Sequence, residues 1–208
     1  MSHGRSDGAR VSCTVDELIE ENVKVINLIH EKYPDLPLIV HGHSMGGMAA
    51  IMTILKKYEE IKGKITAVIT EAPWISKCPQ RELSTIERFG INILQRVWGT
   101  FKVSAGVEMY SPDLDQNWVK MCDESPYYCK SLTPRLYLSV EEAHEFVHAN
   151  ADLWPQELPL LFLQGEVDAL VDAKGNEKWI QAVLAGEGMK VTYKLYPDVP
   201  HVTLKCPK

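Results

Sequence analysis

Leu-Ile-Val-His-Gly-His-Ser-Met-Gly-Gly occupies positions 38–47, a short apolar run that ends in a serine between glycines. This G-x-S-x-G pattern is typical of a buried strand that turns sharply into a helix and exposes the serine hydroxyl at the turn. We expect Gly42 and Gly46 to be required there, because a side chain at either position would collide across so tight a turn. The pattern predicts Ser44 as a nucleophile.

A serine hydroxyl is a weak nucleophile at neutral pH, so the pattern needs a base and an acid elsewhere in the chain. Asp168 follows a second apolar run at 159–163, at the carboxyl end of a predicted strand, where open α/β sheets place reacting groups. His201 follows a third predicted strand at 191–195. The resulting order of Ser44, Asp168 and His201 is that of α/β hydrolases, and it differs from the chymotrypsin and subtilisin orders.

A resemblance to a known family is carried by four short segments. Three of them contain Ser44, Asp168 and His201, at 41–47, 164–168 and 196–201, and the fourth is His-Gly-Arg-Ser-Asp-Gly at 3–8. Along essentially its whole length the chain resembles the monoacylglycerol lipase group of serine hydrolases, also called serine aminopeptidase S33. The resemblance implies an α/β-hydrolase fold with a helical cap. It also implies a lipid-like carboxylic ester as the small-molecule substrate, of the monoacylglycerol or lysophospholipid type, with no cofactor and no metal.

The resemblance further implies that the chain lacks the family's first four strands, its first helix and its closing helix, which leaves a partial parallel sheet with flanking helices. The missing loop would carry one of two oxyanion donors, so only the N–H of Met45 remains. Losing one such donor costs about 10²–10³ in rate. We therefore expect impaired activity, with a non-catalytic remnant or interaction module as the alternative. We also expect residues 38–40 to form an exposed sheet edge.

Composition and resemblance together predict one structural unit. The 208 residues are 45% hydrophobic, enough for a single core. We assign 1–73 and 156–208 to a partial α/β core and 74–155 to the helical cap. The net charge of −6 argues against a nucleic-acid partner, and the oligomeric state stays open.

The cysteines and the chain start predict a cytoplasmic location. Five scattered cysteines indicate reduced thiols rather than a disulfide framework: Cys13, Cys78, Cys122, Cys129 and Cys206. Residues 1–13 are polar and lack the apolar region of a secretory signal, and no run is long enough to span a bilayer. Membrane association through the cap is compatible with both observations.

Helix signals surround the predicted strands. Thr14 and Glu17 form a capping box, and the apolar stripe that follows ends before Pro34. Further helices are expected from Met45 to about Tyr58 and over 174–184, with a strand at 65–70. Within the cap, apolar residues at helical spacing run from Ile86 to Phe101. That face could line an acyl pocket, contact a membrane surface or pack onto the sheet as core.

Two rival motifs remain. His144-Glu145-Phe146-Val147-His148 is a literal H-E-x-x-H, which on a helix could bind zinc with Glu145 as general base, and we expect Ser139 and Glu142 to cap that helix. A third ligand at suitable spacing is missing, so a zinc metalloprotease ranks below the serine hydrolase, with a solvated cap helix as the simpler interpretation.

The second rival concerns the acid. Glu71 directly follows the strand after Ser44, and some α/β hydrolases take their acid from this place. Asp168 is preferred because the string around it matches the family. We expect His43 to be a packing and hydrogen-bonding neighbour and His41 to be buried at the strand end, and neither is a good metal ligand because the turn crowds out a tetrahedral site.

Overall fold

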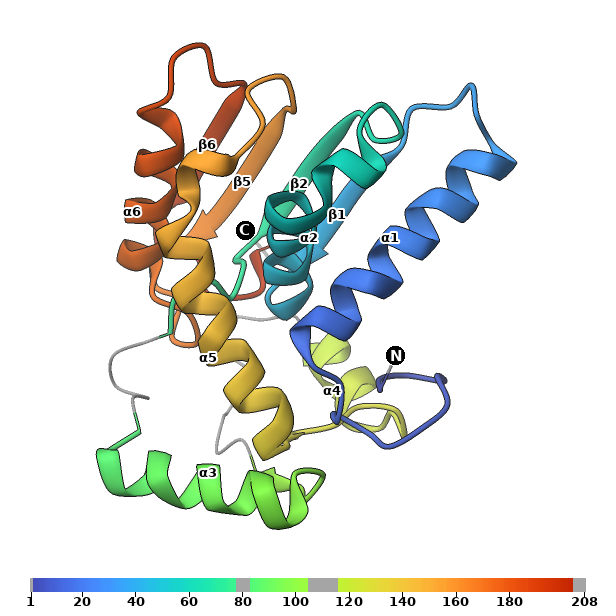
Figure 1. The fold of residues 1–208 in the computed structure, drawn as a ribbon. Helices are drawn as coiled ribbons and strands as arrows, with labels where there is room; N and C mark the ends of the chain where they lie inside the picture. The colour runs from blue at the N-terminus through green and yellow to red at the C-terminus, as the bar shows by residue number, and fades with distance from the viewer. Residues whose placement is uncertain (1, 78–82, 105–115, 204–208) are drawn as a thin grey trace.

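The computed structural model describes residues 2–77, 83–104 and 116–203. Its main sheet contains four parallel strands in the order β1-β2-β5-β6 (Figure 1). The strands are β1 (Ile39–His43), β2 (Ala67–Glu71), β5 (Leu160–Gly165) and β6 (Val191–Tyr196). A separate antiparallel pair joins β3 (Val103–Ser104) to β4 (Ser131–Leu132). The predicted α/β class with a partial parallel sheet is confirmed.

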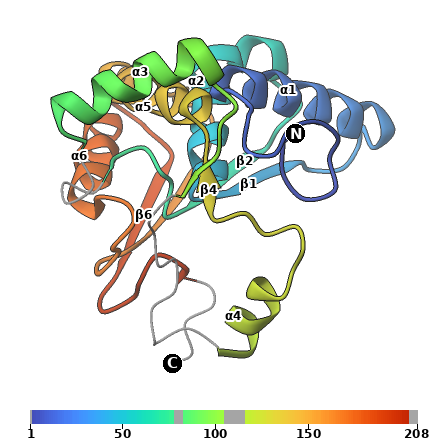
Figure 2. The same cartoon turned by 90° about the horizontal axis from the view of Figure 1, so that it is seen from below.

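Four of the helices supply a second layer. The described helices are α1 (Val15–Lys32), α2 (Met45–Ile61), α3 (Thr85–Trp98), α4 (Gln116–Asp123), α5 (Pro134–Ala149) and α6 (Ala173–Leu184), with a short 3-10 helix, η2 (Ala151–Leu153). Figure 2 shows α1, α2, α5 and α6 on one face of the main sheet. The strand pattern agrees, since Val68, Leu160 and Phe162 are fully buried beneath these helices while the alternating residues Ile69 and Leu161 are half-buried.

The α1 helix begins and packs as its sequence predicts. Thr14 Oγ1 accepts from the N–H of Glu17, and Glu17 Oε2 accepts from the N–H of Thr14, so the capping box is confirmed. The same helix buries Val15 and Ile19 in the core. Because the cap satisfies backbone amides that would otherwise lack partners, it fixes where α1 begins.

The strand that leads to Ser44 lies at a sheet edge, as expected. β1 pairs with β2 along all five of its residues, from Ile39 with Ala67 to His43 with Glu71, and the described residues provide no partner on its other side. Ile39 is 50% exposed. An apolar edge strand with free backbone groups is a potential pairing site for another strand.

The helices within residues 74–155 differ in how much they bury. α3 and α4 bury no side chain, whereas α5 buries Leu136, Val140 and Val147 against the core. Residues of α5 and η2 pack with the core, and the division into core and cap stays a prediction.

One expectation for this region was wrong, and one of three open alternatives is excluded. Ser139 does not cap a helix: Thr133 caps α5, and Ser139 lies inside α5, where its Oγ accepts from the N–H of Val15 at 2.7 Å. Of the three alternatives for the apolar face of α3, packing onto the sheet is excluded, since Ile86 is 84% and Val97 80% exposed. Pro134 explains the error at Ser139, because proline at the first helical position lets the helix begin six residues earlier, with Thr133 as its cap.

Cys13, Cys122 and Cys129 carry free thiols, while Cys78 and Cys206 lie outside the described residues. Burial is the main cause that raises the pKa of Cys13, which disfavours its thiolate. Among the described residues, no helix combines the length and apolar composition needed to cross a bilayer.

Candidate active site

Ser44 occupies a strained turn between β1 and α2. Its backbone has φ 54° and ψ −120°, a left-handed conformation that costs a non-glycine residue about 1–3 kcal/mol. The turn is held from β2 and the segment after it: Ser44 donates its N–H to the Glu71 carbonyl at 3.0 Å, and its own carbonyl accepts from Trp74 at 2.9 Å. The Ser44 side chain does not cap α2, so its hydroxyl remains available to other partners.

The glycines around the turn have unequal roles. A Cβ on Gly42 would overlap the carbonyl of Gly46, so Gly42 is required, as expected. The expectation for Gly46 was wrong, because a Cβ there meets no atom of the described residues within 4 Å. Gly47 is the second glycine that needs to lack a side chain, since a Cβ added there would lie 2.8 Å from Cβ of Pro73. The tight turn brings backbone close to Gly42, while position 46 on the first turn of α2 has no such neighbour within the part of the chain that the structure describes.

His201 reaches Ser44 on a loop that follows β6. A Cβ on Gly165, the last residue of β5, would overlap the carbonyls of Val199 and Pro200. Glycine at this position therefore lets the 199–201 loop cross close over the end of β5. The histidine itself is only 7% exposed. Gly165 lies in one of the segments that carry the family resemblance, but spacing along the sequence gives no sign of this contact.

The structure brings Ser44, His201 and Asp168 together. His201 Nε2 lies 2.9 Å from Ser44 Oγ, and His201 Nδ1 lies 2.7 Å from Asp168 Oδ2. One imidazole therefore bridges a hydroxyl and a carboxylate, which is the arrangement that general-base activation of a serine requires.

Asp168 is held by four donors. Its Oδ1 accepts from the backbone N–H groups of Leu170 and Val171 at 2.8 and 3.0 Å. Its Oδ2 accepts from His201 and from Gln164 Nε2, the latter at 3.2 Å. The side chain has no exposed surface, so these bonds replace hydration of the carboxylate. Gln164 was not singled out from the sequence.

Met45 is the first residue of α2. The first N–H groups of a helix have no intrahelical acceptor, and they carry the partial positive charge of the helix dipole. The N–H of Met45 therefore lies beside the Ser44 hydroxyl at the helix end that favours negative charge.

His43 packs directly on His201. The ring centroids are 4.9 Å apart, and His43 Nε2 donates to the carbonyl of His201 at 3.2 Å. Burial and, secondly, the charge of His201 lower the pKa of His43, which keeps its imidazole neutral. His43 is thus the packing and hydrogen-bonding neighbour that the sequence predicted.

Glu71, the rival acid, and His41 lie near each other on the neighbouring strands β2 and β1. The Glu71 side chain is buried, and its Oε2 lies 4.0 Å from His41 Nε2. The imidazole of His201 is bonded to Asp168 rather than to Glu71. His41 was expected to be buried, but its side chain is 48% exposed because it lies on the edge strand β1.

The H-E-x-x-H motif lies on α5, with both histidines turned toward the segment after β2. His144 Nε2 donates to the Trp74 carbonyl at 2.8 Å, and His148 Nε2 lies 2.8 Å from Ser76 Oγ. The described residues contain no group of three His, Cys, Asp or Glu side chains suited to a metal ion. Through these bonds the two imidazoles hold residues 74–76.

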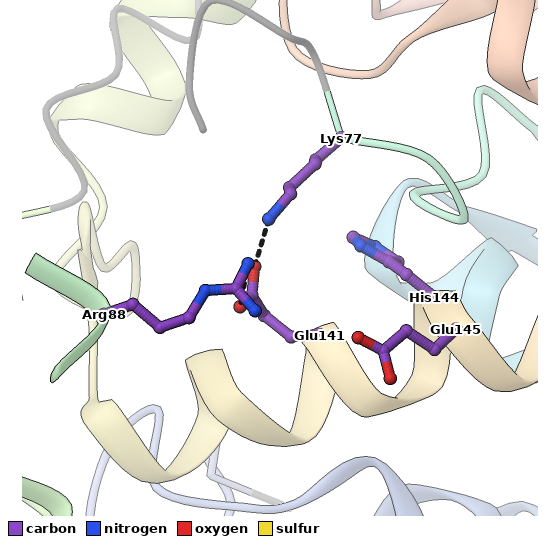
Figure 3. Close-up of a pocket in the computed structure, with 5 residues that line it drawn as sticks. All are labelled: Lys77, Arg88, Glu141, His144 and Glu145. Atoms are coloured by element: carbon purple, nitrogen blue, oxygen red, sulfur yellow. Dashed lines mark hydrogen bonds and ion pairs between the residues drawn. The ribbon is translucent and has the colours of Figure 1, made fainter. Parts of the chain in front are cut away.

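A small charged cavity of about 160 Å³ lies beside this motif (Figure 3). Its lining side chains are Lys77, Arg88, Glu141, His144 and Glu145. Glu141 accepts from Lys77 and from Tyr137, the latter at 2.9 Å, and pairs with Arg88 at 3.1 Å. Because Arg88 belongs to α3 and Glu141 to α5, this ion pair ties the exposed helix to the core.

Known proteins show clear similarity to this chain. The family model described as serine aminopeptidase, S33, matches residues 2–206. Mouse monoglyceride lipase is 22% identical over 203 residues, which cover 97% of this chain and 64% of the relative. The Saccharomyces cerevisiae monoglyceride lipase is 25% identical over 211 residues, with 96% and 64% covered.

A solved structure supports the same assignment. The monoacylglycerol lipase of Paleococcus ferrophilus superposes with a TM-score of 0.78 at 24% identity, over 100% of this chain and 74% of that one. The chain spans about two thirds of the length of the curated relatives it matches, 64% for the mouse protein. The family match over nearly all residues, on a fold shared with known lipases, shows that this chain belongs to the serine aminopeptidase S33 family of α/β hydrolases.

Proposed function

We propose that the chain is a serine hydrolase that cleaves carboxylic esters of lipid-like substrates, of the monoacylglycerol or lysophospholipid type. The observation that carries this proposal is the uninterrupted hydrogen-bond chain from Ser44 Oγ through His201 to the buried carboxylate of Asp168. The substrate class is supported by relatives named as monoglyceride lipases and, over 72% of this chain, by a relative named as a phospholipase from Bacillus subtilis.

The proposed reaction is acyl transfer to water. Ser44 Oγ attacks the ester carbonyl while His201 Nε2 accepts its proton, and Asp168 keeps the imidazole in the tautomer that can do so. The N–H of Met45 stabilises the oxyanion. His201 then gives the proton to the departing alcohol, and a water molecule, deprotonated by the same nitrogen, releases the acid and restores Ser44.

A fluorophosphonate probe with mass analysis of the labelled peptide tests the nucleophile. We expect covalent labelling at Ser44 that disappears in Ser44→Ala, followed by hydrolysis of a monoacylglycerol by the unmodified protein. Well-folded protein without labelling would contradict the proposal and favour the non-catalytic alternative.

We also propose that α3 contacts lipid surfaces through its apolar face. Ile86, Phe89, Ile93 and Val97 recur at helical spacing and are all exposed, and α3 as a whole buries no side chain. A helix with one exposed apolar face gains free energy by placing it at the boundary of headgroups and acyl chains.

Vesicle co-sedimentation tests this contact. Ile86→Asp should reduce the fraction of protein bound to phosphatidylcholine vesicles. Leu28→Asp on α1, another exposed apolar position, provides the matched control and should leave binding unchanged. Equal loss in both variants would exclude a specific role for α3.

A further inference from the structure

A buried pair of amide side chains lies behind Asp168. Gln164 on β5 and Asn176 on α6 both have no exposed surface. Asn176 Nδ2 donates to Gln164 Oε1 at 2.9 Å and to the carbonyl of Pro73 at 2.8 Å. Gln164 Nε2 donates to Asp168 Oδ2 at 3.2 Å and to the carbonyl of Gly165 at 3.0 Å. The pair therefore connects α6, β5 and the segment after β2 to the carboxylate that holds His201.

The surrounding groups permit one orientation of each amide. The NH₂ group of Asn176 faces two carbonyl acceptors, so its amide cannot be reversed without placing oxygen against oxygen. That NH₂ group in turn requires the oxygen of Gln164 on its side, which directs the NH₂ group of Gln164 toward Asp168. The carbonyl of Gly165 favours the same orientation of Gln164 from the other end of its amide. Asn176, which does not touch the carboxylate, therefore reinforces the orientation of a donor at Asp168.

We propose that Gln164 and Asn176 are positioning residues that hold Asp168 in the rotamer required by His201. Both donors at Asp168 Oδ2 are needed to define that rotamer, because the bonds at Oδ1 leave the carboxylate free to tilt about them. This inference rests on the proposed function, since it assigns Asp168 the role of orienting the base.

The bond from Asn176 to Pro73 also links the same hydrogen-bond network to the segment that holds the nucleophile. Pro73 packs against Gly47 on the first turns of α2, and the next residue, Trp74, donates to the carbonyl of Ser44. Asn176 therefore bonds to the segment that holds Ser44 and, through Gln164, to the side chain of Asp168. Geometry between acid and nucleophile matters because a small displacement of reacting groups slows the reaction.

The first test uses Gln164→Met, which keeps an unbranched side chain of similar length and removes the donor. We expect the rate constant for labelling of Ser44 by a fluorophosphonate to fall about fivefold, the effect of one net hydrogen bond. We also expect the low-field proton NMR resonance of the bond between His201 and Asp168 to broaden or disappear. Asn22→Leu is the matched control. It removes a part-buried side-chain hydrogen bond between α1 and α2, from Asn22 Nδ2 to Thr53 Oγ1 at 3.0 Å, and it should change neither readout.

The double variant Gln164→Met with Asn176→Leu separates positioning from folding. Replacing both members of the bond between Gln164 and Asn176 leaves neither side of that bond unpaired, so the double variant should lose less stability in urea than the two single variants added together. The labelling rate should stay low, because the donor at Asp168 is still absent. Recovery of labelling together with stability, or an unchanged low-field resonance in Gln164→Met, would overturn the inference.

These readouts also separate this inference from the proposed function. If the unmodified protein is not labelled at Ser44, the proposed function fails. In that case the low-field resonance still decides the inference: its loss in Gln164→Met but not in Asn22→Leu supports positioning of Asp168, and its persistence in Gln164→Met refutes it.

Discussion

His144 donates from Nε2 to the backbone carbonyl of Trp74 at 2.8 Å. The N–H of Trp74 donates in turn to the carbonyl of Ser44 at 2.9 Å. A buried histidine on α5 therefore supports the proposed nucleophile through a single intervening residue. Removing or charging His144 should affect the stability of the segment that holds the turn.

Protonation of His144 should destabilise the fold at acidic pH. Burial is the main cause that lowers its pKa to about 4, and the nearby charge of Lys77 acts in the same direction. Below about pH 6.5 the unfolded chain binds a proton that the native protein does not, so stability should fall as the pH drops from about 6.5 to 4, by up to about 3 kcal/mol. Urea unfolding at pH 7 and pH 5 measures the effect.

Gln is the control substitution at this position, because its amide can donate to the Trp74 carbonyl without titrating. His144→Gln should reduce the dependence of stability on pH. Some dependence should remain, since burial also lowers the pKa values of His43 and His148. An unchanged pH dependence in His144→Gln would contradict the assignment.

Alanine at Gly42 and at Gly46 should have opposite outcomes. Gly42→Ala forces a Cβ into the carbonyl of Gly46, so we expect loss of labelling at Ser44 and several kcal/mol of destabilisation, as for other overpacked sites. Gly46→Ala places the same methyl group in open space on a helix, where alanine is favoured over glycine by up to about 1 kcal/mol. Thermal unfolding and labelling of the two variants provide a matched comparison.

Substitution of the two candidate acids should distinguish them. Asp168→Asn should lower the labelling rate about 10⁴-fold, because the amide favours the wrong tautomer of His201. Glu71→Gln should remain near the rate of the unmodified protein, since Nδ1 of His201 bonds to the carboxylate of Asp168. A larger loss in Glu71→Gln than in Asp168→Asn would reverse the assignment of the acid.

Arg88→Ala should loosen α3 without unfolding the core. The variant removes the ion pair between Arg88 and Glu141, and α3 buries no side chain that could replace it (Figure 3). We expect faster amide hydrogen exchange in α3 and a nearly unchanged melting temperature, because a partly exposed pair contributes at most about 1 kcal/mol. Arg96→Ala, on the last turn of the same helix, controls for loss of a positive charge.

Local sequence signals predicted several elements well. The capping box at Thr14 and the glycine at position 42 impose constraints that act over a few residues, so the start of α1 and the turn at Ser44 could be derived from spacing alone. The same reasoning failed at Ser139, where an S-x-x-E spacing occurs inside a helix whose beginning is set by Thr133 and Pro134.

Contacts between distant segments could not be predicted in this way. The exposure of His41 follows from its place on an edge strand, and the exposed face of α3 follows from where that helix lies relative to the sheet. Hydrophobic spacing describes which side of a helix is apolar, but it does not say what covers that side.

The sequence by itself determined the parallel α/β class, the order of Ser44, Asp168 and His201, and the sharp turn at Gly42, because each depends on local backbone geometry or on strand ends. Only the tertiary structure decided that His201 bonds to Asp168 rather than to Glu71. It also decided that His144 and His148 bond to the segment at 74–76. The bonds of Gln164 to Asp168 and to Asn176 likewise follow from the tertiary structure alone. These outcomes depend on side-chain directions across residues far apart in the chain, which spacing along the sequence does not encode.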